Sequence, residues 1–180
     1  MTQTRRRSVR PAGFTLVESA VSVAIAAVLV ELAVLNFGAL IEKQRLEGAA
    51  AQLAADLQLL RTEAHARSQS LRLSIYNAGA ASCCVIHIGS HSDCSCQAEG
   101  GAVCSDPSLA LKSVHWRAGE PLLNSNVGSL VYDPAQATVT PTGSLRVIDG
   151  RGRTITHVVN IVGRVRSCSP APPLPGYVAC

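Results

Sequence analysis

Residues 14–68 of the chain read FTLVESAVSVAIAAVLVELAVLNFGALIEKQRLEGAAAQLAADLQLLRTEAHARS, and this stretch contains no proline. Because proline is the residue that most strongly interrupts a helix, the stretch predicts one continuous helix, about 80 Å long at 1.5 Å per residue. Within residues 14–41 the only ionisable side chains are Glu18 and Glu31. A helix of about 20 mostly apolar residues crosses a bilayer, so residues 14–41 are predicted to be a transmembrane segment.

The second half of the predicted helix, residues 42–69, is amphipathic. Its apolar residues recur at steps of three and four, which places them on one face of a helix. They are Leu46, Ala50, Leu53, Leu57, Leu60 and Ala64. The polar residues lie mostly off that face: Lys43, Arg45, Glu47, Gln52, Asp56, Arg61 and Glu63. This half is therefore expected to pack against a globular domain.

Residues 70–168 favour β-strands separated by Gly, Pro, Asn and Asp. The predicted strands are 71–76, 83–88, 110–117, 129–132, 137–140, 144–148, 154–161 and 162–166. Asp149 to Gly152 is predicted to form a type I′ hairpin turn, because Asp-Gly suits that turn. The tail, residues 169–180, holds four prolines between 169 and 176, where it is expected to be extended and without regular structure. The predicted fold class is α+β, with the long helix packed on an antiparallel β-rich domain.

The N-terminal leader is basic. Residues 1–13 contain four arginines and no acid, and the formal net charge of the whole chain is +4, so the remainder is formally neutral. Arginines ahead of an apolar segment keep that end in the cytoplasm. A secretory signal peptide has an apolar region of roughly 7–15 residues and then a small-x-small site. Here the apolar run is longer, and Gly13 precedes it.

The sequence GFTLVE at residues 13–18 resembles the type III signal of type IV pilins and type II secretion pseudopilins. The resemblance implies cleavage between Gly13 and Phe14 by a prepilin peptidase, and N-methylation of Phe14. Glu18 then occupies the fifth mature position, where the family carries its glutamate. An uncleaved signal anchor is the alternative. Two features depart from the family: residues 33–36 lack the proline that pilins commonly have there, and Glu31 lies inside the apolar run, near the periplasmic interface or paired in an assembly.

The resemblance gives Glu18 a physical role in assembly. A carboxylate at membrane depth is costly unless it is paired. Cleavage creates a cationic amine on Phe14, which in a filament can pair with Glu18 of a neighbouring subunit. Docking therefore satisfies an acid that a single subunit leaves unpaired.

Two longer stretches narrow the resemblance to the GspH/FimT branch of the pseudopilins. They are QRLEGAAAQLAADLQLLRTEAHARSQSLRL at residues 44–73 and GSLRVIDGRGRTITHVVNIVGRVRSC at residues 143–168. The family implies a minor subunit that assembles with other pilins into a type II secretion pseudopilus or a type IV pilus. It implies a single-pass protein of the bacterial inner membrane whose residues 14–41 form the filament core and whose residues 70–168 lie in the periplasm.

Seven cysteines are many for a chain of 180 residues. Five of them lie with two histidines in one cluster: Cys83, Cys84, His87, His91, Cys94, Cys96 and Cys104. Zinc binding is one interpretation, but Cys94-x-Cys96 is tighter than usual zinc spacing, and an oxidising periplasm favours disulfides. Five cysteines allow two bridges and one leftover, which is either reactive or intermolecular; the pairing is not readable. Cys168 and Cys180 flank the tail, and a bridge between them would pin it, contributing about 3 kcal/mol.

The C-terminal third is locally basic. Residues 144–166 contain one acid, Asp149, against Arg146, Arg151, Arg153, Arg164 and Arg166. Arg164 and Arg166 alternate in the predicted strand 162–166, so they are expected to share one face. Guanidinium groups suit phosphate oxygens. Some FimT-type minor pilins bind double-stranded DNA through a C-terminal Gly-Arg-x-Arg motif, which Gly163-Arg164-Val165-Arg166 matches. The alternatives are a solvated strand edge, or arginines that pair with acids of neighbouring subunits.

No sequence motif predicts catalysis. The chain lacks a Gly-x-Ser-x-Gly elbow, a P-loop and His-Glu-x-x-His, while His65, His115 and His157 are isolated in sequence. We therefore expect no enzyme and no cofactor. The hypotheses are a structural pilus or pseudopilus subunit, a DNA-binding minor pilin used for DNA uptake, and a monomeric metal-binding membrane protein.

Overall fold

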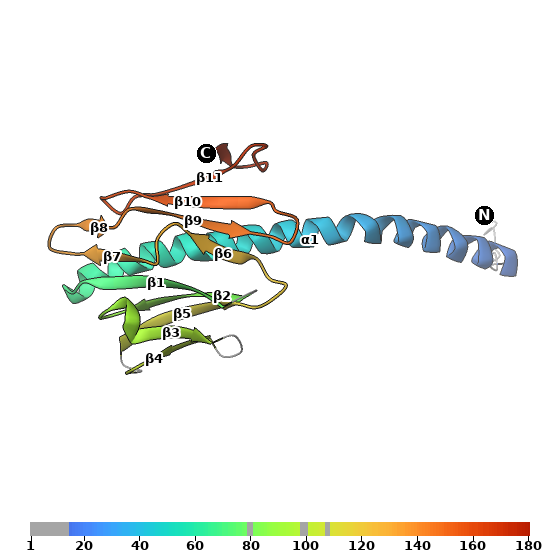
Figure 1. Ribbon diagram of the computed structural model, residues 1–180. Coiled ribbons are helices and arrows are strands. Elements are labelled where there is room, and N and C mark those ends of the chain that lie inside the picture. Colours follow the sequence, from blue (N-terminus) through green and yellow to red (C-terminus); the bar gives the residue numbers. More distant parts are fainter. Residues whose placement is uncertain (1–14, 79–80, 98–100, 107–108) are drawn as a thin grey trace, which may run out of the picture. The chain divides into compact units, whose positions relative to one another are not determined.

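A computed structural model describes residues 15–180 except 79–80, 98–100 and 107–108 (Figure 1). Side chains at 32–36, 78 and 101 are also outside the description. The chain divides into two units, one up to Leu40 and one from Ile41 to Cys180. The predicted leader, Gly13 and Phe14 lie outside the described residues.

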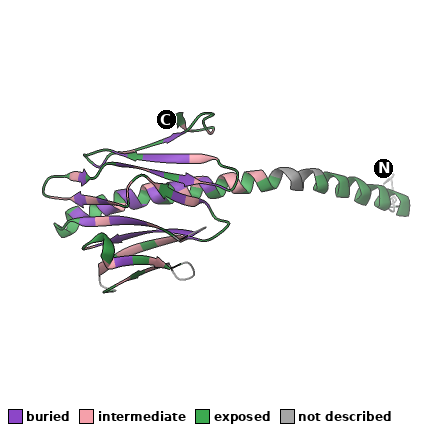
Figure 2. Cartoon of the chain, viewed as in Figure 1, coloured by how far each residue is buried: buried purple, intermediate pink, exposed green. Residues whose placement is uncertain are grey.

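Helix α1 runs from Leu16 to Arg67, which confirms the long helix expected over residues 14–68. In its first turn Thr15 Oγ1 accepts a hydrogen bond from the Glu18 N–H at 3.2 Å, as a helix N-cap does. Up to Leu40, the described residues of α1 are almost all exposed (Figure 2). No helix among the described residues has the length and apolar character that spanning a membrane requires.

The C-terminal end of α1 is closed by its backbone. The Gln69 N–H donates to the Ala64 carbonyl and the Ser68 N–H to the His65 carbonyl, both at 3.1 Å, which is the Schellman arrangement. Ser68 takes φ 50°, a left-handed conformation that this arrangement requires and that glycine usually supplies. The chain thereby leaves the helix and enters the first strand at Leu71.

Two five-stranded sheets form most of the second unit within the described part of the chain. The first has the order β5-β2-β1-β7-β8, and the second β12-β11-β10-β9-β6. In the first sheet the bounds are β1 Leu71–Ala78, β2 Ala81–His87, β5 Ala110–Trp116, β7 Ser129–Asp133 and β8 Thr138–Thr140. In the second they are β6 Leu122–Ser125, β9 Gly143–Ile148, β10 Thr154–Val159, β11 Val165–Ser169 and β12 Val178–Ala179. A short helix η1 (His91–Asp93) precedes a separate hairpin of β3 (Cys94–Gln97) and β4 (Gly101–Cys104).

The apolar stripe of α1 lies in the core with side chains from both sheets. Buried segments of α1 and of both sheets are purple in Figure 2. All six residues predicted for the stripe are buried: Leu46, Ala50, Leu53, Leu57, Leu60 and Ala64. The α+β class and antiparallel pairing are confirmed for these sheets, except that β12 pairs parallel to β11.

One polar residue of α1 was misplaced by the pattern. Asp56 is buried rather than on the solvent face, and it pairs with Lys112 of β5 at 2.6 Å. Gln52 also donates to Asp56, at 3.0 Å. Lys112 is 56 positions away in the sequence, so the periodicity of the helix could not show this partner.

The strand predictions needed three corrections. Strands β3, β4, β6 and β12 were missed, because their sequences CSCQ, GAVC, LLNS and VA are short and do not alternate clearly. The strand expected at 162–166 begins later, at Val165, because Asn160 to Gly163 forms a turn. The type I′ prediction is also wrong. A type I′ turn requires a positive φ at both central residues. Neither Gly150 nor Arg151 has one, whereas Gly152 has φ 79°. This hairpin has a three-residue loop with glycine at the left-handed position.

Candidate functional site

The basic region predicted over residues 144–166 is divided between the two ends of strand β10. The β9–β10 turn carries Arg151 and Arg153, while the β10–β11 turn and the start of β11 carry Arg164 and Arg166. Strand β10 has six residues, so its ends are roughly 20 Å apart at about 3.3 Å per residue. The four arginines therefore do not form one patch.

Acidic side chains surround the arginines of the β9–β10 turn. Asp149, which is 8% exposed, accepts the Arg151 and Arg153 N–H groups at 3.0 and 2.9 Å and the Arg153 Nε–H at 2.6 Å. Glu42 of α1 forms an ion pair with the Arg151 Nε and lies 3.7 Å from the Arg153 Nη2. These two arginines join the turn to the helix, and their charges are balanced within the domain.

The β10–β11 turn is held mainly by Asn160. The Gly163 N–H donates to the Asn160 carbonyl at 2.9 Å, and the Arg164 N–H donates to its Oδ1 at 2.8 Å. Gly163 has φ 71°, and a Cβ there would lie 3.2 Å from Tyr132 and 3.3 Å from Val139. The glycine of the Gly-Arg-x-Arg motif is thus required by the turn and by its packing.

Arg164 and Arg166 are exposed, and no ion pair involves either of them within the described part of the chain. Arg166 lies opposite Val158 in the β10–β11 register. Because β11 begins at Val165, Arg164 belongs to the turn rather than to the strand, contrary to the prediction that both arginines alternate along one strand. Among the described residues neither guanidinium group has an ion-pair partner, so both remain available to a ligand or to another chain.

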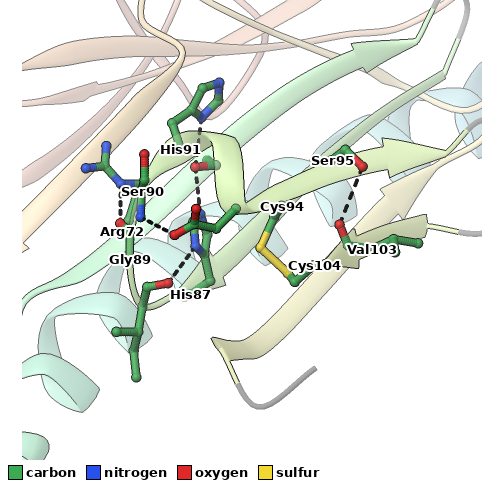
Figure 3. Close-up of a disulfide and its surroundings, with 12 residues drawn as sticks. Arg72, His87, Gly89, Ser90, His91, Cys94, Ser95, Val103 and Cys104 are labelled. Carbon is green, nitrogen blue, oxygen red and sulfur yellow. Dashed lines mark hydrogen bonds between the residues drawn. A yellow bond between two sulfur atoms is a disulfide. The ribbon is translucent and has the colours of Figure 1, made fainter. Parts of the chain in front are cut away.

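The cysteine cluster is organised by disulfides around the β3–β4 hairpin. Cys94 and Cys104 bridge the two strands of the hairpin (Figure 3), and Cys83 of β2 is bridged to Cys96 of β3. Cys168 is bridged to Cys180, the pair that flanks the tail. No group of three or more potential metal ligands occurs among the described residues.

The leftover cysteine is Cys84, which is 2% exposed. Burial, with a smaller contribution from the nearby Asp56 carboxylate, raises its pKa to about 12. The thiol therefore stays protonated at neutral pH, and its burial keeps it away from reagents and from other chains in this structure. Cys83 and Cys84 face opposite sides of β2, since Cys84 joins the main core and Cys83 a smaller cluster under the hairpin.

A serine and two histidines beside the β3–β4 hairpin form a network that the sequence did not reveal. Ser74 Oγ lies 2.8 Å from His87 Nε2 and 3.0 Å from His91 Nδ1. Figure 3 labels both histidines. His87 Nδ1 lies 3.1 Å from the Ile88 carbonyl, so Nε2 is the acceptor and Ser74 donates to it. Burial lowers the pKa of His87.

A serine so close to a histidine is the arrangement of an activated nucleophile. However, both Ser74 and His87 are 0% exposed, so substrate cannot reach the hydroxyl. The network fixes η1 to the sheet.

These features define a class of protein in which a helix with exposed apolar side chains precedes a disulfide-bonded, β-rich domain. The family comparison agrees: residues 49–163 match the family described as type II transport protein GspH, and the chain belongs to that family. Its members are structural pseudopilin or minor pilin components of secretion or pilus systems, and they assemble with other pilin subunits. Neither curated proteins nor solved structures gave a match. The matched residues exclude Glu18, Arg164 and Arg166.

Proposed function

We propose that the chain is a minor subunit that enters a type II secretion pseudopilus or a type IV pilus through its N-terminal helix. The family match carries this proposal. It is supported by the exposure of apolar side chains along α1, for example Leu16 at 84% and Val23 at 69%, because such a surface requires an apolar environment.

In this proposal residues 14–41 serve first as an inner-membrane anchor and then as the filament core. The prepilin peptidase removes residues 1–13, and Phe14 is N-methylated. Residues 42–69 continue the helix, and residues 70–168 with the tail 169–180 lie in the periplasm, where the three disulfides form. Glu18 pairs with the Phe14 amine of a neighbouring subunit and sets the register of assembly.

The test is made in the bacterium that produces the protein. Filaments sheared from the cells should contain the chain, and its mature N-terminus should begin at N-methylated Phe14 by mass spectrometry. Glu18→Gln should keep the chain in the membrane fraction but remove it from filaments, while Ser22→Ala, a matched change one turn away, should not. A chain that retains residues 1–13, or that never enters filaments, contradicts the proposal.

A second candidate function is binding of double-stranded DNA for uptake. The observation that favours it is the pair of exposed arginines, Arg164 and Arg166, which have no intramolecular ion pairs in the described residues. Each phosphate contact contributes about 0.9 to the slope of log affinity against log salt. Replacing both residues by glutamine should therefore lower the slope by about 2 and weaken binding at every sequence tested. An unchanged slope contradicts DNA binding at these residues.

A further inference from the structure

The turn between β10 and β11 presents two adjacent aliphatic side chains to solvent. Ile161 is 55% exposed and Val162 is 52% exposed, between Asn160 and Gly163. Val158, 39% exposed on β10, lies opposite Arg166. Exposed aliphatic residues are ordinary when scattered singly, but neighbouring ones beside charged residues mark interaction sites. We call Ile161, Val162, Arg164 and Arg166 the apical patch.

The apical patch is held rigidly by the backbone on both sides. Besides the two hydrogen bonds to Asn160, the Ile161 carbonyl accepts the Val139 N–H at 2.6 Å. Gly163 packs on the ring of Tyr132, whose hydroxyl lies 2.6 Å from His65 Nε2 at the end of α1. A turn fixed in this way loses little conformational entropy when a partner binds, so its exposed side chains are pre-organised for contact.

The charge of the patch restricts the partner to an anionic one. Arg164 and Arg166 lie two and four residues after Val162, and neither pairs with an acid in the described part of the chain. The partner surface should combine an apolar hollow with carboxylates at its edge, because it must accept the aliphatic pair and the guanidinium groups together.

We propose that the apical patch docks on another pilin subunit, inserting Ile161 and Val162 into an apolar pocket bordered by carboxylates. This inference rests on the proposed function, since assembly with other pilins supplies the partner. A DNA duplex would engage the arginines but would offer phosphates to most of the aliphatic surface. Membrane-surface segments usually present a long apolar face with many basic residues, which this short turn lacks. Arginine around a buried apolar centre is typical of protein interfaces.

The test places a photoreactive residue at the apex in the full-length protein, within the producing bacterium. With Ile161→p-benzoylphenylalanine, ultraviolet light should give an adduct with another pilin subunit in sheared filaments. The same residue at Val103, which is 47% exposed on β4, is the matched control and should give at least tenfold less adduct. Adding Arg164→Gln and Arg166→Gln should lower the yield at least fivefold, whereas Arg146→Gln, at another exposed arginine, should not.

Mass spectrometry of the adduct supplies the decisive detail. The crosslinked peptide of the partner should contain apolar residues next to Asp or Glu. If the chain is recovered in filaments but forms no pilin adduct, or forms one with phospholipid or with DNA, the docking proposal is overturned while the proposed function stands. If the chain is absent from filaments, both fail together.

Discussion

The two turns that flank β10 have the same sequence pattern and different chemistry. Residues 150–153 read Gly-Arg-Gly-Arg and residues 163–166 read Gly-Arg-Val-Arg. In the first turn Asp149 and Glu42 neutralise both arginines, whereas in the second both guanidinium groups are free of intramolecular ion pairs in the described structure. The glycines differ as well: Gly163 has a positive φ and close neighbours, but Gly150 has neither. A four-residue motif therefore does not establish a binding site unless the surrounding acids are known.

Removing the acid of the first turn should have the largest effect. Asp149→Ala deletes three hydrogen bonds and leaves Arg153, 25% exposed, with a weaker ion pair. We expect the free energy of unfolding to fall by about 2–3 kcal/mol, because breaking the close pair with Asp149 leaves a partly buried charge with only the longer contact to Glu42. Chemical denaturation of residues 41–180, which contain the buried core, measures this. A loss below about 1 kcal/mol would show that the contacts of Asp149 in the first turn contribute little to the free energy of unfolding, as is expected for the arginines of the second turn.

The two motif glycines provide the next contrast. Gly163→Ala places a methyl group 3.2 Å from Tyr132 at φ 71°, and should cost about 1–2 kcal/mol of unfolding free energy. Gly150→Ala meets nothing within 4 Å and should change stability by less than about 0.5 kcal/mol. Denaturation of both variants under oxidising conditions makes the comparison. Equal losses would contradict the assignment of Gly163 as the packed glycine.

Strand β10 itself should make stability depend on pH. His157 is 2% exposed, its Nδ1 lies 2.9 Å from Ser167 Oγ, and burial lowers its pKa. A histidine with a lowered folded pKa binds its proton more readily in the unfolded state, so stability is lost as pH falls below about 6.5. The loss is at most about 1.4 kcal/mol per pH unit for one proton.

The pH effect is checked by measuring unfolding between pH 7 and pH 5, above the range where most carboxylates titrate. His157→Gln should flatten the curve partly, because His87 is also buried with a lowered pKa and continues to contribute. If the free energy of unfolding changes equally with pH in the unchanged protein and in the His157→Gln variant, His157 is not a source of the pH dependence.

Local patterns predicted the helix and its stripe because both depend on neighbours three and four residues away. They also indicated the β9–β10 hairpin and the tail cysteines. Non-local partners were invisible: Lys112 for Asp56, Glu42 for Arg151, and Ser82 of β2, whose Oγ accepts the Leu123 N–H at 2.9 Å and helps to hold β6. The arginines of the site were therefore predicted, but their arrangement was not, because the Glu42 that pairs with Arg151 lies more than a hundred residues away in the sequence.

The smallest expected effect completes the comparison of the two turns. Replacing Arg164 and Arg166 together by glutamine should change the free energy of unfolding by less than about 0.5 kcal/mol, because neither forms an ion pair in the described structure. The matched change, Arg151 and Arg153 to glutamine, should cost clearly more, since it removes the pairs with Glu42 and leaves Asp149 without its guanidinium partner. Chemical denaturation of the two double variants under the same conditions compares their free energies of unfolding. If the first double variant is as unstable as the second, Arg164 and Arg166 also stabilise the fold, and any loss of binding in that variant would have to be ascribed to unfolding.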